Sequence, residues 1–204
     1  MIYRTALKSE YRILADIHNE AFGSFFLTSL GIRFLRVYYK ASLKSKNCIA
    51  TCALSDEGEI IGFCLGSFVS HGHHTRLIAS NAPLFILEGL LIIFSKPLAI
   101  LRLLRNLDKK IAGITDDGNY SELLSIGVRP AIKGKGIGSE LIRRFENEIV
   151  KRGGTKICLT TDYFDNDGAI AFYRKSGYEV FYEFTTYPDR KMIKLVKYLQ
   201  EHKE

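Results

Sequence analysis

The sequence predicts an α/β protein with a mixed sheet and helices on both of its faces. Segments with the two-residue period of strands alternate with segments of helical period, and this alternation follows an opening hairpin. The chain has 204 residues, no internal repeat and no Pro/Gly-rich linker, so it can form one well-packed domain but not two of ordinary size. Residues 1–204 are therefore assigned to a single domain.

The first 70 residues predict a strand, two helices and a hairpin. Leu14 and Ile17 continue a helical spacing that begins at Leu7, and apolar residues recur in the same way through the second helix. The segment Asp56-Glu57-Gly58-Glu59 is a hairpin signal between two apolar runs. The expected elements are a strand over 2–6, helices over 8–21 and 26–43, and strands over 47–54 and 59–69.

Residues 71–118 are an insert with an unusual composition. An apolar run from Pro83 to Phe94 contains Glu88 and is too short for a membrane span of about 20 residues. We expect two short helices here, broken near 95–97, with the second over 98–107. The insert is expected to line the binding site of a substrate or to form a homodimer contact. A weak contact with a membrane surface through Arg102 and Arg105 is the alternative.

The pattern is clearest after Tyr120. In the strand that begins there, Leu124, Ile126 and Val128 share one side, and Ser125 and Gly127 share the other. An amphipathic helix follows and is stopped by a pair of glycines. The expected elements are strands over 120–128 and 156–162, helices over 136–151 and 166–176, and strands over 178–185 and 190–197.

A glycine-rich turn joins that strand to the amphipathic helix, in the order Val128-Arg129-Pro130-Ala131-Ile132-Lys133-Gly134-Lys135-Gly136-Ile137-Gly138-Ser139-Glu140-Leu141. Free backbone N–H groups at the N-terminus of a helix make an anion site, and two lysines add positive charge. A pyrophosphate is therefore the expected ligand. Neither the Walker pattern nor GxGxxG fits the glycine spacing. A flexible turn that only caps the helix is the other interpretation.

The turn resembles the acetyl-CoA-binding motif of the GNAT N-acetyltransferase superfamily. A second segment, Asn166-Asp167-Gly168-Ala169-Ile170-Ala171-Phe172-Tyr173-Arg174-Lys175-Ser176-Gly177-Tyr178, is similar to that family's Asn-x-x-Ala-x-x-x-Tyr-x-x-x-Gly-Phe/Tyr element. The likeness is specific over 120–182 and loose over 1–70. It implies a GNAT-like fold with a mostly antiparallel sheet, with residues 71–118 as a helical insert before the cofactor-binding strand.

The resemblance also implies a set of cofactor-binding residues. Acetyl-CoA would be a cosubstrate, with no metal, and the amides of the turn would hold its pyrophosphate. Asn166 is expected chiefly to cap its helix through its side chain. The cofactor-binding residues implied are Ile126, Val128, Lys133, Gly134, Lys135, Gly136, Ile137, Gly138, Ser139, Asn166 and Tyr173.

Direct transfer of an acyl group to an amine needs a base, an oxyanion donor and an acid for the departing thiolate. Tyr173 matches the family position whose hydroxyl protonates the thiolate, although an aromatic residue packed beneath the sheet is the simpler interpretation. Glu122 matches the family's base, or is an exposed carboxylate at a strand end. Asp162 is the rival base or a contact for the acceptor amine. The main chain of Val128 would polarise the thioester.

The acceptor does not follow from the residues. An amino sugar carried on a nucleotide is the first hypothesis, and a polyamine, an aminoglycoside or a protein amino group remain open. The length of the acyl group is open as well. The competing class is a non-catalytic acyl-CoA-binding sensor or interaction module, which would need the glycine turn but neither Glu122 nor Tyr173.

The remaining features exclude several other classes of protein. The net charge of +7 comes from scattered cations without interleaved aromatic residues, which does not indicate a nucleic-acid partner. The four cysteines lack a CxxC pair, and no secretory signal begins the chain, so we expect buried free thiols in the cytoplasm. The His71-Gly72-His73-His74 cluster is interpreted as a polar loop, because no further metal ligand lies at a suitable spacing.

Overall fold

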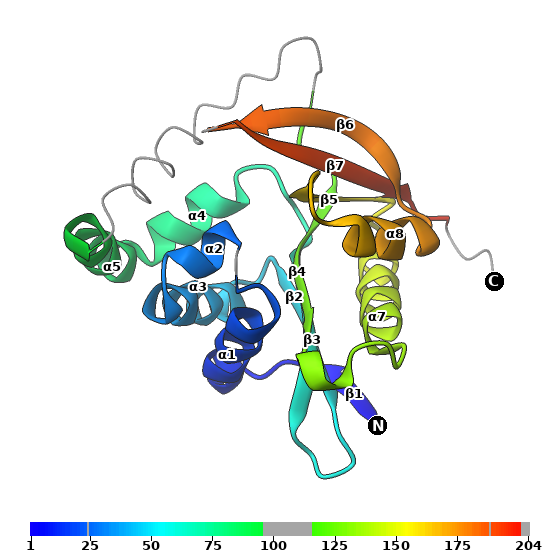
Figure 1. Ribbon diagram of the computed structural model, residues 1–204, viewed down its shortest axis with the longest axis horizontal. Coiled ribbons are helices and arrows are strands. Elements are labelled where there is room, and N and C mark those ends of the chain that lie inside the picture. Colours follow the sequence, from blue (N-terminus) through cyan, green and yellow to red (C-terminus); the bar gives the residue numbers. More distant parts are fainter. Residues whose placement is uncertain (24, 96–115, 188, 201–204) are drawn as a thin grey trace.

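A computed structural model describes residues 1–23, 25–95, 116–187 and 189–200. It confirms the mixed, mostly antiparallel α/β architecture: seven strands form one sheet in the order β1-β2-β3-β4-β5-β7-β6 (Figure 1). Every neighbouring pair is antiparallel except β4–β5, which is parallel. The strands are β1 (Ile2–Thr5), β2 (Cys48–Leu54), β3 (Ile60–Ser67), β4 (Ser121–Val128), β5 (Lys156–Asp162), β6 (Glu179–Thr186) and β7 (Arg190–Tyr198).

Helices from the N-terminal part of the chain cover one face of the sheet (Figure 1). After the short 3-10 turn η1 (Lys8–Glu10), they are α1 (Tyr11–Ala21), α2 (Phe26–Ser29) and α3 (Ile32–Lys44). The single helix predicted over 26–43 is wrong in one respect, because the chain breaks at Gly31. The φ angle of Gly31 is 100°, a backbone conformation that other residues rarely adopt. Buried Leu14, Leu35 and Tyr39 pack this layer against Phe63 of β3.

The opposite face is covered by α7 (Ile137–Lys151) and α8 (Asp167–Lys175), which enclose a second core (Figure 1). One stripe of α7 is fully buried, as its sequence period predicts, and includes Leu141, Phe145 and Ile149. These residues meet Ile157 of β5 and other apolar side chains of the central strands. The two cores bury every residue of β3 and most of β2, while β4 alternates between buried and partly buried residues, so the central strands form a rigid frame for what they carry.

The insert begins with two helices, α4 (His73–Ser80) and α5 (Ala82–Ser95). The helix predicted from the apolar run is confirmed as α5, but the polar loop expected over 71–74 is wrong in part, since α4 starts at His73. The chain bends by 94° between α4 and the Ala82–Ile93 part of α5; among the described residues no single helix is long and apolar enough to cross a membrane. The break expected near 95–97, the helix over 98–107 and the roles given to Arg102 and Arg105 lie outside the described residues.

Candidate functional site

The turn between β4 and α7 has the geometry of an anion cradle. After a 3-10 turn, η2 (Pro130–Ile132), the φ angles of Gly134 and Gly136 are 85° and 77°. Among the described residues, the backbone N–H groups of 134–139 have no hydrogen-bond partner within the protein. A Cβ atom added at Gly134 or Gly136 would meet nothing within 4 Å, so the amides border open space. The side chains of Lys133 and Lys135 are exposed beside them. This arrangement suits a di- or polyphosphate group.

Strands β4 and β5 separate close to this turn. They pair only where Ser121–Leu123 run beside Ile157–Leu159, although β4 continues to Val128 and β5 to Asp162. The Arg129 N–H donates to the Ile61 carbonyl, at 2.9 Å, on the side of β3. Because N–H directions alternate along an antiparallel strand, the N–H groups of Val128 and Ile126 point the other way, toward the gap left by β5. Both residues are predicted to bind a cofactor, and β5 provides no backbone partner for their amides.

A β-bulge in β4 corrects one prediction about side-chain direction. The register with β3 shifts between Leu65 and Gly66, where Leu124 is the extra residue of β4. Leu124 therefore packs in the core beneath α1 and α3, while Ile126 packs in the core beneath α7 and α8. The expectation that these two residues share one side is wrong. The bulge turns the end of β4 at the point where the strand leaves β5.

Tyr173 lies on α8 among aromatic neighbours. Its ring centroid is 5.2 Å from that of Phe172 and 6.0 Å from that of Tyr178, and burial raises the pKa of its hydroxyl. The hydroxyl is therefore protonated at neutral pH, as an acid must be. The ring of Phe172 lies 3.5 Å from the position of a Cβ atom on Gly138, so this helix packs against the glycine turn. Tyr173 itself is partly buried in the core beneath α7 and α8.

Glu122 lies at the start of β4, on the face opposite to Tyr173. Its half-buried carboxylate accepts a hydrogen bond of 2.6 Å from Ser70, and the Ser70 N–H donates to the Tyr120 carbonyl at 3.0 Å. Its charge is one cause of the raised pKa of Tyr38 on α3, after burial and Cys48, which places the carboxylate on the α3 side. This carboxylate has one oxygen engaged by a neutral donor and is not paired with a cation among the described residues. A proton acceptor needs such a free lone pair.

Asp162 and Asn166 are engaged within the protein. Both oxygens of Asp162 accept hydrogen bonds from the guanidinium of Arg190. The Asn166 side chain donates to Thr161 Oγ1 at 2.6 Å and to the Asp162 carbonyl at 3.1 Å. The prediction that this side chain caps α8 is wrong, because its amide bonds back to β5, and only the Asn166 carbonyl receives amides of the first turn. Together these contacts fix the loop between β5 and α8 beside the gap.

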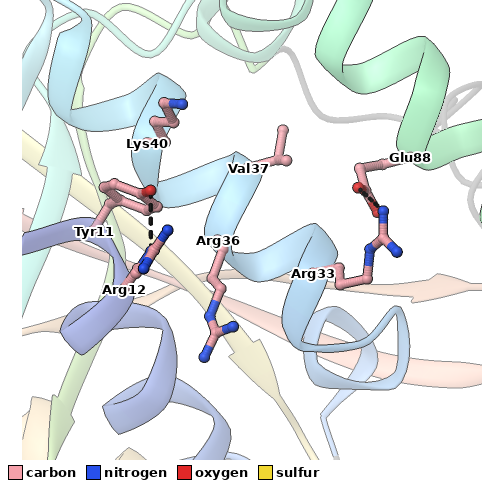
Figure 2. A pocket seen from close by; sticks show the side chains of 7 residues that line it. All are labelled: Tyr11, Arg12, Arg33, Arg36, Val37, Lys40 and Glu88. Carbon is pink, nitrogen blue, oxygen red and sulfur yellow. Dashed lines mark hydrogen bonds and ion pairs between the residues drawn. The ribbon is translucent and has the colours of Figure 1, made fainter.

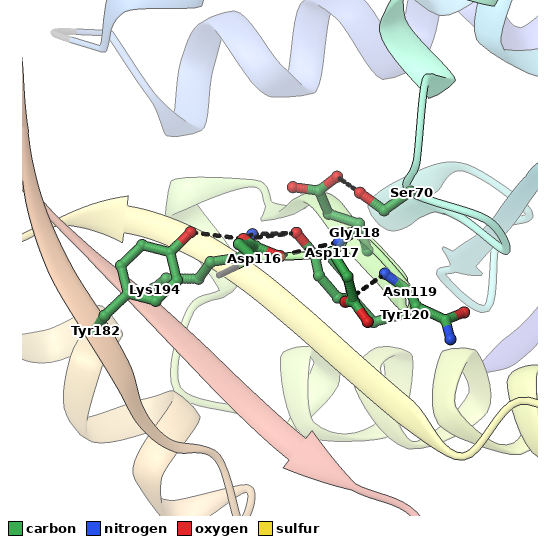
Figure 3. A network of polar contacts seen from close by, with 9 residues as sticks. Ser70, Asp116, Asp117, Gly118, Asn119, Tyr120, Tyr182 and Lys194 are labelled. Atoms are coloured by element: carbon green, nitrogen blue, oxygen red, sulfur yellow. Dashed lines mark hydrogen bonds and ion pairs between the residues drawn. The ribbon is translucent and has the colours of Figure 1, made fainter. Parts of the chain in front are cut away.

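Sequence reasoning missed a polar network at the other end of β4 (Figure 3). Lys194 of β7 is 6% exposed, and its Nζ lies 2.6 Å from the Asp116 carboxylate and donates to the Tyr120 hydroxyl. The Tyr182 hydroxyl donates to the same carboxylate at 2.6 Å. Burial opposes ionisation of Asp116, but the bonds from Lys194 and Tyr182 outweigh it and lower its pKa to about 2. A lysine within the apolar run 192–196 was the available signal.

The histidine cluster does not form a metal site in the part of the chain that the structure describes. His73 is buried on α4, and its Nδ1 lies 3.0 Å from the Asn47 amide nitrogen. Burial lowers the pKa of His73 to about 4, so the ring is neutral and structural. The four cysteines are free, as predicted; three are buried and Cys48 is partly buried, and burial raises the pKa of the Cys48 thiol to about 12.

Comparison with known proteins agrees with this geometry. The sequence profile described as "Acetyltransferase (GNAT) family" matches residues 11–178. A curated acetyltransferase from Pectobacterium atrosepticum is 40% identical over 63 residues, which are 31% of this chain and only 44% of that protein. The chain therefore spans less than half the length of this relative.

Two solved structures share the fold at low identity. A ribosomal-protein-alanine N-acetyltransferase from Brucella melitensis has a TM-score of 0.61 and 15% identity, with 98% of this chain and 100% of that chain covered. An aminoglycoside 6'-N-acetyltransferase complexed with coenzyme A has a TM-score of 0.59 and 17% identity, with both chains fully covered. The profile, which spans most of the chain, and the shared fold lead to one conclusion: this chain belongs to the acetyltransferase (GNAT) family.

Proposed function

We propose that the protein is an acetyl-CoA-dependent N-acetyltransferase that transfers acetyl directly to a primary amine. The observation that carries the proposal is the glycine turn, whose unpartnered amides and exposed lysines adjoin the gap between β4 and β5. A pyrophosphate bound at this turn would direct the rest of an extended cosubstrate along β4. Membership of the acetyltransferase (GNAT) family supports the same ligand. A protein of the same fold has been solved in complex with coenzyme A.

Each step of the transfer has a candidate residue. Glu122 accepts a proton from the ammonium form of the acceptor, directly or through water, and the freed amine attacks the thioester carbonyl. The outward N–H of Val128 stabilises the oxyanion as the C–N bond forms. When the C–S bond breaks, the Tyr173 hydroxyl gives its proton to the thiolate, and the tyrosinate then takes up the second proton of the new amide nitrogen. Asp162 is the weaker candidate for the base, because Arg190 already engages both of its oxygens.

The acceptor we propose is a small amine, and an amino sugar on a nucleotide is the first to test. The support is the positive formal charge of the chain, which attracts an anionic carrier and disfavours polycationic acceptors. Four free thiols also fit a reaction in a reducing compartment such as the cytoplasm.

The test is thiol release from acetyl-CoA with a panel of amino-sugar nucleotides, polyamines, aminoglycosides and peptides. We expect release with one class, reduced about 100-fold or more in kcat by Glu122→Gln and by Tyr173→Phe. The matched controls are Glu179→Gln and Tyr198→Phe, since both residues are exposed and lie on β6 and β7, outside the turn and outside β4. Acetyl-CoA binding without release from any acceptor would instead favour the non-catalytic binding module.

A further inference from the structure

Helix α5 presents a wholly apolar surface outward. It lies at the outer edge of the molecule, away from the sheet (Figure 1). Its exposed side chains are Ile86, Leu87, Leu90, Leu91 and Ile93, which are 61%, 54%, 50%, 40% and 46% exposed. At 100° per residue these five positions share one side of a helix. They form one contiguous surface, which we call the α5 apolar face.

The inner side of α5 is where its only charged residue lies. Glu88 is 7% exposed and contacts Arg33 of α3 at 3.2 Å. Phe85 packs edge-on against Phe34, with ring centroids 6.0 Å apart. A helix at a water-facing surface has the opposite arrangement, with its charges outward and its apolar stripe inward. This inverted arrangement indicates that the outward side of α5 contacts an apolar partner in the functional state.

A basic groove adjoins this helix (Figure 2). Its volume is about 330 Å³, and Glu88 is the only acid among its lining residues. Lys40 and Arg12 lie over the ring of Tyr11, at 5.6 and 5.7 Å from its centroid, while Arg33 reaches toward Glu88. The lining residues are Tyr11, Arg12, Arg33, Arg36, Val37, Lys40 and Glu88.

We propose that this part of the protein binds the surface of an anionic membrane. The α5 apolar face would enter the interface between headgroups and acyl chains. Arg12 and Lys40 would bind the lipid phosphates, since Arg33 and Arg36 are paired with Glu88 and Asp16. The described part of α5 has 14 residues and is about 21 Å long, which by itself is shorter than a bilayer core of roughly 30 Å, so we place α5 in the surface. This inference is independent of the acyl transfer proposed above.

Other occupants fit the same surface less well. A second copy of the chain would cover the apolar face, but it would bring two basic grooves near one another. A nucleic acid would match the cations and leave five aliphatic side chains without a role. A surface that is apolar inside and anionic at its rim offers a partner for both features.

The test is co-sedimentation of the full chain with vesicles. Vesicles of phosphatidylcholine with 30% phosphatidylglycerol, a composition chosen for the assay, are compared with pure phosphatidylcholine, each at low and at high salt. We expect binding to the anionic vesicles that weakens as salt rises. The double variant Leu87→Gln/Leu90→Gln should bind at least about tenfold more weakly, because two inserted side chains are lost.

Matched controls distinguish this proposal from nonspecific adsorption to vesicles. Ile13 and Val180 are also exposed, on α1 and β6, so Ile13→Gln/Val180→Gln should bind like the unaltered chain. Arg12→Gln/Lys40→Gln should weaken binding by about fivefold for each cation removed. The control Lys46→Gln/Lys175→Gln, which removes the same charge elsewhere, should weaken binding less. Circular dichroism checks that each variant is folded. The proposal is overturned if the folded chain does not sediment with anionic vesicles. It is also overturned if light scattering shows that the only effect of Leu87→Gln/Leu90→Gln is to dissociate a dimer.

Discussion

The glycine turn allows backbone strain and ligand crowding to be measured apart. Gly136 begins α7 with a φ angle of 77°, and Gly153 follows the same helix with a φ angle of 81°. A Cβ atom at either residue would meet no protein atom within 4 Å. The two positions therefore carry the same strain on substitution, but only Gly136 lies among the unpartnered amides of the turn.

We predict that Gly136→Ala and Gly153→Ala lower the free energy of unfolding by similar amounts, about 1–2 kcal/mol each. Only Gly136→Ala should also weaken acetyl-CoA binding, because its Cβ enters the space next to the phosphates. The loss of one good hydrogen bond to a charged group is worth roughly 1.5–3 kcal/mol, which corresponds to about 10- to 150-fold in Kd.

The assay combines urea unfolding, followed by circular dichroism, with calorimetric titration of acetyl-CoA into each folded variant. Equal unfolding free energies with unequal Kd values would support a phosphate cradle at 134–139. If both substitutions leave the Kd unchanged, the turn does not bind the phosphates. If both weaken binding equally, the effect comes from distortion of α7, and the reasoning about crowding fails.

Two further predictions concern the polar network of Figure 3. Lys194→Met should lower the free energy of unfolding in urea by about 3–5 kcal/mol, because it leaves the Asp116 carboxylate largely buried without a cation. Adding Asp116→Leu to the same chain should recover much of this loss. A Lys194→Met chain as stable as the unaltered one would contradict a structural role for the pair. Since the folded-state pKa of Asp116 is lowered to about 2, its contribution is complete above the unfolded pKa, near 4, and disappears as the pH falls from there through 2. Unfolding measured from pH 5 to 2 should show this loss, of about 2 kcal/mol, and Asp116→Asn should not show it.

Local patterns predicted the parts of the fold that depend on near neighbours. The period of α7, the hairpin at Gly58 and the apolar run of α5 all appear within about 15 residues of sequence, and each of these elements is confirmed. The family resemblance added the mostly antiparallel character of the sheet. The break at Gly31 was missed because the apolar period continues on both sides of it, and a helix with one interior glycine costs only about 1 kcal/mol.

The features that were missed depend on partners far apart in the sequence. Asp116 and Lys194 are 78 residues apart, and nothing in either local segment indicates that β7 lies between β5 and β6. The bulge at Leu124 follows from the register with β3, which the sequence of β4 does not contain. Asn166 is an exception, because its partners are near in sequence: the side chain expected to cap α8 instead bonds to Thr161 and to the Asp162 carbonyl, five and four residues earlier.

The separation of β4 from β5 explains how two predicted catalytic residues on opposite faces could serve one reaction. Glu122 lies on the side of α3, and Tyr173 lies in the core beneath α7 and α8. In a continuous sheet the backbone between them would keep any shared substrate out. Here the last paired residues are Leu123 and Leu159, so beyond them no hydrogen bonds between β4 and β5 close the sheet. A thioester reaching through this gap would have the base and the amine on one side and the acid near its sulfur on the other. The proposed transfer therefore depends on the early end of the β4–β5 pairing as much as on the two side chains.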